Sequence, residues 1–220
     1  MNRVVRLIVL LGISSLASLN ATLAGSASIV TIATPRGVQQ PFILIKPDHA
    51  IASVILFAGG EGVLRLNRVP PPAVGADALV NGNFLVRSRE KFAGHGFVVA
   101  VIDVPSDHQD GMSPVFRVSH EHAIDIGAVA EYLKSQADVP VWLVGTSAGS
   151  WSAAGGAIAA GRNGIATGVI DGLVLTSAVT RIARGSAIAR SFPGFAGDYP
   201  DSALALSEIR VPTADAVERR

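Results

Sequence analysis

The chain has 220 residues, of which 49% are hydrophobic, and this is enough for one domain built around a single core. Its formal net charge is +1 and it has no long basic run, so it lacks the concentrated positive surface that nucleic-acid binding needs. It contains no cysteine, which excludes disulfides, cysteine-ligated zinc and a thiol nucleophile.

The first 27 residues have the pattern of a secretory signal peptide. Arg3 and Arg6 are followed by an apolar run over 7–19 and then by small residues, with cleavage expected after Ala24 or Ala27. The apolar run is short for a membrane-spanning helix, which needs roughly 20 residues. We therefore expect an exported protein, periplasmic or secreted, with no membrane span after cleavage. The alternatives are an uncleaved N-terminal anchor and a misassigned start codon.

Residues 28–220 alternate between predicted strands and helices. Apolar or β-branched runs predict a hairpin around Pro35-Arg36-Gly37 and four strands buried on both faces. Helical spacing and a capping Ser119 predict the segments between them as helices. The strands are expected at 28–34, 39–46, 53–58, 97–104, 139–145 and 173–178, and the helices at 83–93, 119–136 and 148–161. The order favours an α/β fold of three layers, with a mainly parallel central sheet between helices.

Two helices and one loop give more specific expectations. In the first helix, Phe84, Leu85, Ser88 and Phe92 are predicted to share the buried face. In the second, the buried stripe is expected to comprise His122, Ile126, Val129 and Leu133, with Glu121, Asp125 and Lys134 outside it. Residues 61–82, which are rich in proline and glycine, are predicted to form an irregular loop over the sheet edge, as part of a substrate entrance.

The five residues Gly145-Thr146-Ser147-Ala148-Gly149 lie between a predicted strand and a helix of small residues. A G-x-S-x-G string alone is a weak signal, but in this context it fits a nucleophile elbow, a turn so tight that its flanking residues must lack bulk. Such a turn places the serine hydroxyl at the helix N-terminus, where unpaired N–H groups favour negative charge. The alternative is an ordinary strand-to-helix turn with a capping serine.

The chain resembles the α/β-hydrolase superfamily over residues 28 to about 212. The resemblance rests on this turn, on the order of elements and on a glycine turn at Gly59-Gly60. The resemblance implies hydrolysis of an ester-like or other small acyl substrate, with Ser147 as nucleophile and no cofactor or metal. It also implies that the backbone N–H groups of Ala148 and of Gly60 or Glu61 form the oxyanion hole. The lipase-type His-Gly-Gly-Gly string is absent, and a simple tight turn is the alternative for the glycines.

The resemblance fails in the last part of the chain. The family order is serine, then an acid, then histidine, but all five histidines here precede Ser147. No apolar strand leads to Asp215, and residues 213–220 do not continue the apolar run. This pattern indicates a domain that lacks its last strands through truncation or a frame change. A parallel edge left bare in this way would invite self-association.

Among the histidines, His122 is the best candidate for the base of Ser147. His49 and His95 precede strands and should lie at the opposite end of the sheet, whereas His108, His120 and His122 follow one. The alternative is that His122 only packs its helix against the sheet. The residues considered for orienting it are Asp103, Asp107 and Asp110, and those considered as the catalytic acid are Asp198 and Asp201, with Asp171 disfavoured.

Two rival functions follow from the same residues. The densest set of potential metal ligands is Asp103, Asp107, His108, Asp110, His120 and His122, but His-Glu-His is not a zinc-enzyme motif, and residues two apart do not share a helix face. No phosphate-binding glycine motif is present, which disfavours nucleotide binding. The missing late histidine instead supports a catalytically inactive or binding-only relative of the hydrolases.

Overall fold

The computed structural model of the chain describes residues 25–69, 82–161, 165, 168–183, 186–187 and 202–216. Of residues 214–216 it describes the backbone alone. Most of the predicted signal peptide and the triple-proline part of the predicted loop therefore lie outside the described residues, as do Asp198 and Asp201. Within the described residues, no helix is both long and apolar enough to cross a bilayer.

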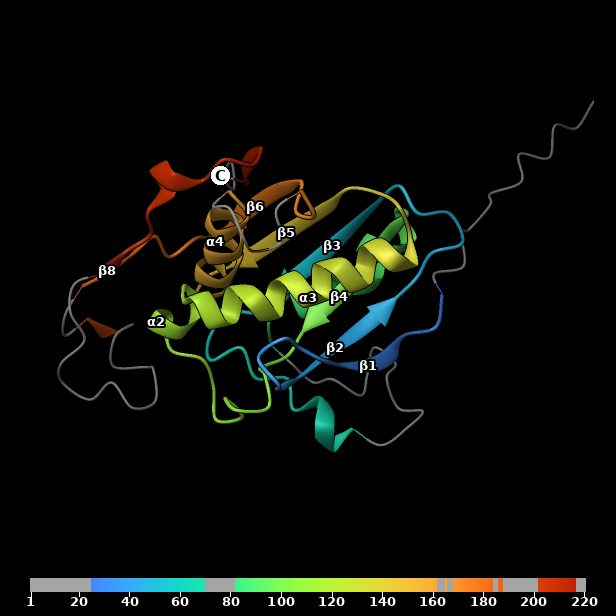
Figure 1. The fold of residues 1–220 in the computed structure, drawn as a ribbon, viewed down its shortest axis with the longest axis horizontal. Coiled ribbons are helices and arrows are strands. Elements are labelled where there is room, and N and C mark those ends of the chain that lie inside the picture. Colours follow the sequence, from blue (N-terminus) through green and yellow to red (C-terminus); the bar gives the residue numbers. More distant parts are fainter. Residues whose placement is uncertain are drawn as a thin grey trace, which may run out of the picture.

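A seven-stranded sheet forms the centre of the fold, in the order β1-β2-β4-β3-β5-β6-β9 (Figure 1). Strands β1 and β2 form an antiparallel hairpin, β2 pairs antiparallel with β4, and all other neighbours are parallel. The predicted hairpin and mainly parallel sheet are thus confirmed. The strands are β1 (Ser28–Ala33), β2 (Gln39–Ile45), β3 (Ala52–Phe57), β4 (Phe97–Ile102), β5 (Val141–Thr146), β6 (Gly172–Thr176) and β9 (Thr213–Ala216).

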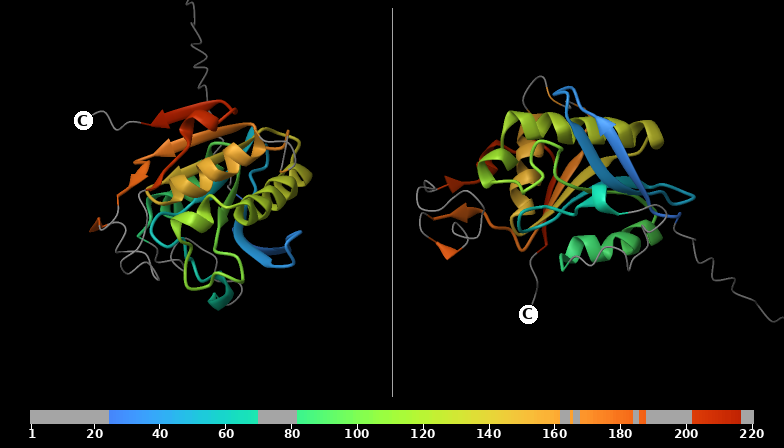
Figure 2. Two further views of the ribbon diagram at one scale, coloured as in Figure 1. Left: turned by 60° about the vertical axis from the view of Figure 1, so that its left-hand side comes forward. Right: turned by 90° about the horizontal axis from the view of Figure 1, so that it is seen from below.

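Helices cover both faces of the sheet, as predicted (Figure 2). They are α1 (Phe84–Gly94), α2 (Pro114–Arg117), α3 (His120–Gln136) and α4 (Gly149–Ala160). Because side chains alternate along each strand, Ile55 and Phe57 pack with α3 and α4 on one face, while Val54 and Leu56 pack with α1 on the other. Short 3-10 turns η1 (Leu66–Arg68) and η2 (Leu206–Glu208) and a small two-stranded sheet of β7 (Arg181–Ile182) and β8 (Ser202–Ala203) complete the described elements.

The predicted helix faces are correct for most positions and wrong for two. All four residues of the predicted α3 stripe are fully buried, and the Ser119 hydroxyl accepts a hydrogen bond from the His122 N–H as the expected cap. Asp125, predicted outside the stripe, is also fully buried, because an arginine neutralises it. In α1, Phe84 is 55% exposed, since the helix instead turns Leu85 and Val86 toward the sheet.

No buried strand is predicted to lead to Asp215, and the structure places Asp215 in a short edge strand. Strand β9 extends the sheet beyond β6, with Leu175 of β6 in register with Asp215. The Leu173 N–H donates to the Pro212 carbonyl just before this pairing begins. An edge strand is held by backbone hydrogen bonds on one side only, so it does not need the apolar pattern of a central strand. The edge of β6 is therefore paired along β9 and not bare.

Candidate active site

The turn of residues 145–149, which we call the Ser147 turn, has the tight geometry that the sequence predicts. Ser147 has φ +51°, in the left-handed region that non-glycine residues rarely occupy. A β-carbon at Gly145 would lie 2.7 Å from the Gly149 carbonyl oxygen, and one at Gly149 would collide with the Phe57 carbonyl oxygen. Both flanking positions therefore require glycine, and the turn packs directly against the end of β3.

The backbone around this turn leaves donors free. The Ser147 N–H donates to the Thr176 carbonyl at 3.3 Å, while the Ala148 N–H at the start of α4 donates to no group among the described residues. The Ser147 side chain is half-buried, and its hydroxyl likewise has no described partner. A free N–H at a helix start next to an open hydroxyl is an arrangement that suits a developing negative charge.

A second turn, residues 59–62, lies against the first, and we call it the glycine turn. The Gly62 N–H donates to the Gly59 carbonyl at 3.2 Å, and Gly60 has φ +59°. A β-carbon at Gly59 would lie 3.0 Å from the Ser147 β-carbon, so the two turns touch. Within the described part of the chain, neither the Gly60 nor the Glu61 N–H donates a hydrogen bond. The expected oxyanion donors thus have no hydrogen-bond partner among the described residues, and the glycine turn lies against Ser147.

No motif in the sequence marks Ser177, which also has a left-handed backbone, with φ +44°. It follows β6 just as Ser147 follows β5, and the residues before the two serines, Thr146 and Thr176, are paired in register. The Thr176 hydroxyl donates to the Thr146 hydroxyl at 3.3 Å. Ser177 therefore stands beside Ser147 at the carboxyl end of the sheet. Ser177 has no flanking glycines from which the sequence could predict this turn.

His122 is fully buried and, among the described residues, makes no hydrogen bond to Ser147. Its ring lies against Phe116 and Phe57, with centroids 5.2 and 6.4 Å away, and neither ring nitrogen has a hydrogen-bond partner among the described residues. Burial, followed by the charge of Arg117, lowers the pKa of His122 to about 3. No described contact joins His122 to Ser147, so the structure adds no support to the expectation that His122 serves as the base. The geometry matches the alternative, in which His122 packs its helix against the sheet.

The other histidines are no closer to that role. His49 and His95 precede β3 and β4, whose first residues Ala52 and Phe97 are paired in register, so both lie at the end of the sheet opposite Ser147. His120 is exposed. His108 stacks on the Phe116 ring at 3.6 Å and contacts Asp107. No described histidine makes a hydrogen bond to Ser147.

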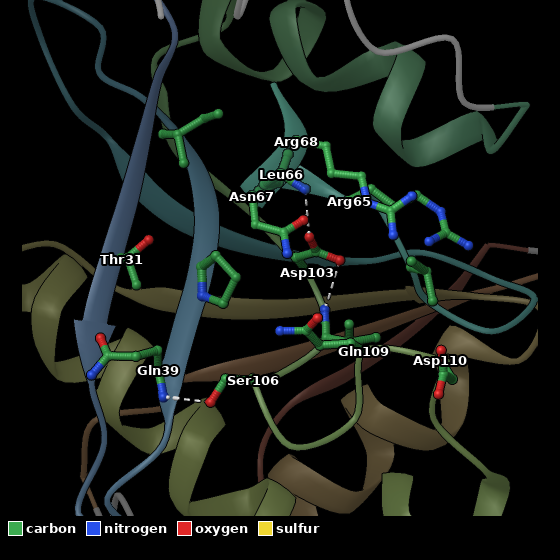
Figure 3. A pocket seen from close by; sticks show the side chains of 14 residues that line it. Thr31, Gln39, Arg65, Leu66, Asn67, Arg68, Asp103, Ser106, Gln109 and Asp110 are labelled. Carbon is green, nitrogen blue, oxygen red and sulfur yellow. Dashed lines mark hydrogen bonds between the residues drawn. The ribbon is translucent and has the colours of Figure 1, made fainter. Parts of the chain in front are cut away.

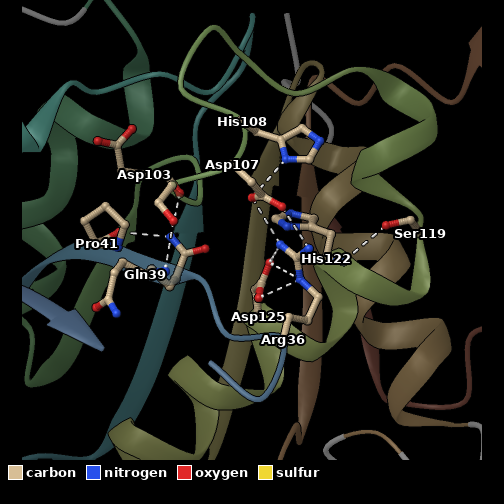
Figure 4. Close-up of polar contacts among 11 residues, drawn as sticks. Arg36, Gln39, Pro41, Asp103, Asp107, His108, Ser119, His122 and Asp125 are labelled. Atoms are coloured by element: carbon tan, nitrogen blue, oxygen red, sulfur yellow. Dashed lines mark hydrogen bonds and ion pairs between the residues drawn. The ribbon is translucent and has the colours of Figure 1, made fainter. Parts of the chain in front are cut away.

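Four ionisable side chains, Arg36, Asp107, His108 and Asp125, form what we call the charged cluster (Figure 4). Arg36, from the β1–β2 turn, donates through Nε and Nη2 to Asp125 and through Nη1 to Asp107, at 2.7 to 3.1 Å. The Asp125 hydrogen bond raises the pKa of Arg36. Burial opposes ionisation of Asp107, but hydrogen bonds from Arg36 and His108 outweigh it and lower its pKa to about 2. The cluster fastens the hairpin to α3.

Asp103 has a structural position at the end of β4 (Figure 3). Its carboxylate accepts hydrogen bonds from the N–H groups of Leu64, Leu66 and Val104 at 2.7 to 2.9 Å. Burial raises its pKa, an effect that these three bonds partly offset. It thereby anchors the described part of the predicted loop, where η1 forms. Arg65 in this segment is left-handed, with φ +59°.

A cavity of about 320 Å³ lies between this segment and the β1–β2 hairpin (Figure 3). Its polar lining includes Gln39, Arg65, Asp103, Ser106 and Asp110, and no residue of the Ser147 turn or the glycine turn reaches it. The described loop residues 63–68 therefore border a cavity, but one separate from Ser147. Asp110 belongs to this lining and not to the surroundings of His122.

The remaining acidic candidates are dispersed. Asp171 accepts a hydrogen bond from the Val141 N–H and pairs with Lys134, at the opposite end of β6 from Ser177, as expected for a residue that begins this strand. Asp103, Asp107 and Asp110 each have separate surroundings. In the part of the chain that the structure describes, no three histidine or acidic side chains converge on a position for a metal ion.

Comparisons with known proteins rest on structure alone. No protein-family model matches the sequence, and no curated protein is detectably similar to it. The structure of DcsB in complex with its substrate analogue is 17% identical, with a TM-score of 0.51 over 75% of this chain and 48% of that one. Brefeldin A esterase, a bacterial homologue of human hormone-sensitive lipase, is 17% identical, with a TM-score of 0.48 over 70% of this chain and 40% of that one.

The Pyrococcus furiosus esterase Pf2001 is also 17% identical, with a TM-score of 0.46 over 69% of this chain and 51% of that one. This chain thus spans about half the length of the solved structures that it matches. Its mainly parallel sheet lies between helices on both faces, as the sequence predicts, and DcsB is similar to it in fold. At this level of identity, the similarity shows the fold and not the reaction.

Proposed function

We propose that the chain is a serine hydrolase that acts on ester-like acyl substrates, with Ser147 as its nucleophile. One observation carries this proposal: Ser147 is held in a left-handed conformation between two obligatory glycines, at the start of a helix. Backbone strain of this kind costs about 1–3 kcal/mol and persists where the surroundings enforce it, commonly at functional sites. The same geometry aims a serine hydroxyl at free N–H groups in nucleophile elbows.

The proposed reaction has two steps. The Ser147 oxygen attacks the substrate carbonyl carbon and gives up its hydroxyl proton to water. The carbonyl π electrons move onto the carbonyl oxygen, to which the N–H groups of Ala148 and the glycine turn donate hydrogen bonds. Collapse of this intermediate breaks the bond to the alcohol, which leaves with a proton, and water then releases the acid from the acyl-serine. Each oxyanion donor contributes about 2.7–4 kcal/mol in known enzymes of this kind.

A second candidate function is binding of an acyl compound without hydrolysis. It is favoured by one observation, namely that no histidine or carboxylate among the described residues hydrogen-bonds to the Ser147 hydroxyl. A serine hydroxyl without a base is a weak nucleophile. We do not include His122 in the proposed machinery, because both of its ring nitrogens are buried without partners.

Hydrolysis of p-nitrophenyl acetate and butyrate separates the two functions. The proposal predicts turnover by the wild-type chain that falls at least about 1000-fold in Ser147→Ala. Ser150→Ala is the matched control: its hydroxyl is buried in α4, directly after the Ser147 turn, and has no partner among the described residues, so turnover should persist. His122→Ala should also retain it. Saturable binding of the esters without turnover would favour the second function and contradict the first.

A further inference from the structure

Arg117 is buried without a counter-charge. Its side chain is 1% exposed, and no carboxylate in the described part of the chain pairs with it. Nη1 donates to the Ser152 hydroxyl and Nη2 to the Gly60 carbonyl, both at 2.9 Å, while Nε has no partner. Burial lowers the pKa of Arg117 to about 10, so the guanidinium still carries its charge at neutral pH. Buried charges are ordinarily paired, because isolation from water is costly.

The contact with Gly60 fixes the glycine turn. Glycine occupies positive and negative φ with similar ease, so Gly60 alone leaves the orientation of the Gly60–Glu61 peptide open. A peptide unit is planar and trans, so its carbonyl and N–H point in opposite directions. By holding the Gly60 carbonyl on one side, Arg117 keeps the Glu61 N–H on the other. Gly62 has φ +80°, which favours glycine, and a β-carbon there would lie 2.8 Å from Nη2.

From these contacts, and resting on the proposed function, we infer that Arg117 is a positioning residue that sets the oxyanion donors of the glycine turn beside Ser147. The hydrogen bond to the Gly60 carbonyl also polarises that peptide, which strengthens its N–H as a donor. Arg117 has no counter-charge among the described residues, and acyl transfer would bring a negative charge on the substrate oxygen to the turn that Arg117 holds. In a site of low dielectric, a fixed positive charge near this oxygen favours the transition state over the neutral ester.

The inference is tested with Arg117→Lys and Arg117→Met, using Arg36→Lys as the matched control. Arg36 is also an arginine of low exposure, but it belongs to the charged cluster. For p-nitrophenyl acetate, the inference predicts a kcat lowered roughly 10- to 100-fold in the Arg117 variants, with KM changed less than about threefold. Arg36→Lys should lower the thermal midpoint and leave kcat unchanged. Equal kcat in folded wild type and Arg117→Lys would overturn the inference.

A second measurement on the folded variant does not depend on activity. In ¹H–¹⁵N spectra of folded Arg117→Lys, the Glu61 amide peak should move strongly relative to wild type, while that of Val98 in β4 stays in place. An unmoved Glu61 peak overturns the positioning role, whether or not the chain hydrolyses esters. If wild type shows no turnover but the Glu61 peak moves, the proposed function fails and the positioning of the turn stands.

Discussion

The Ser147 turn and the charged cluster both lie beyond carboxyl ends of strands in one sheet. The first is formed by backbone groups and the second by side chains. The Ser147 turn consists of backbone: glycines in close contact, a left-handed serine and an Ala148 N–H with no partner among the described residues. The charged cluster consists of side chains that satisfy one another through Arg36. A dense set of ionisable groups is thus stabilising here, whereas unsatisfied backbone donors mark the place suited to chemistry.

The largest expected effect tests the stabilising role of the charged cluster. Asp125→Ala removes a fully buried carboxylate and leaves Arg36 with only its partly exposed partner Asp107. Breaking a buried pair in this way costs about 3–5 kcal/mol, and the remaining partner places the expected loss near 3. Urea unfolding measures it. Turnover per folded molecule should not change, and a kcat that fell with stability intact would give the cluster a catalytic role.

The buried His122 should make the free energy of unfolding depend on pH. Its pKa is about 3 in the folded chain and 6.5 ordinarily, so the unfolded chain binds more protons between these values. The free energy of unfolding is therefore highest above pH 6.5 and falls as the pH falls toward 3. By pH 4 this loss is about 3 kcal/mol.

His122→Leu, which has no group to titrate, should flatten the stability profile over this interval and unfold no more easily than wild type at pH 7. Urea unfolding at pH 7 and pH 4 is sufficient to measure it. Parallel profiles for the two proteins would mean that His122 is protonated or solvated in the folded chain.

Gly149 packs against the Phe57 carbonyl, so a larger residue there should lower turnover much more than it lowers the free energy of unfolding. Gly149→Ala forces the start of α4 away from the Phe57 carbonyl. Such overpacking costs roughly 1–3 kcal/mol of stability. Since the displacement moves the Ala148 N–H away from its position beside the glycine turn, turnover should fall at least about 100-fold. Stopped assays on folded protein, verified by circular dichroism, test this. Retained turnover would show that the contact does not set the site.

The smallest effect is expected at the exposed side of the charged cluster. The pKa of Asp107 is about 2, below its ordinary 3.8, so its contribution to stability is complete above pH 4 and is lost toward pH 2. Its side chain is 36% exposed, and solvent screening keeps this contribution below about 1 kcal/mol. Asp107→Asn should therefore lower the unfolding free energy slightly at pH 6 and not at all at pH 2. A loss as large as that of Asp125→Ala would refute this difference.

The sequence predicts the central elements because their signals are local. The runs that form β3 to β6 are mostly apolar, and the cap at Ser119 marks the start of α3. The tight turn at Ser147 was likewise visible in its flanking glycines. Strand β9 was missed because an edge strand is recruited by the backbone of β6, and its own residues carry no apolar pattern.

The polar contacts could not be predicted, because they join distant positions. The helical spacing predicts Asp125 outside the buried stripe, and its partner Arg36, which allows it to be buried, is 89 positions away. Arg117 reaches Gly60 over 57 positions, and nothing in either segment marks the pair. His122 was correctly placed on the buried stripe, but only the structure shows that aromatic rings enclose it.

The central claim, that Ser147 is an activated nucleophile, is tested most directly by a fluorophosphonate probe. Purified chain is incubated with the probe, and the modified residue is located by intact mass and peptide mapping, with Ser147→Ala and Ser150→Ala alongside. We predict a single adduct on Ser147, absent in Ser147→Ala and retained in Ser150→Ala. Folded wild-type chain that acquires no adduct, or one that maps to another serine, would contradict the account.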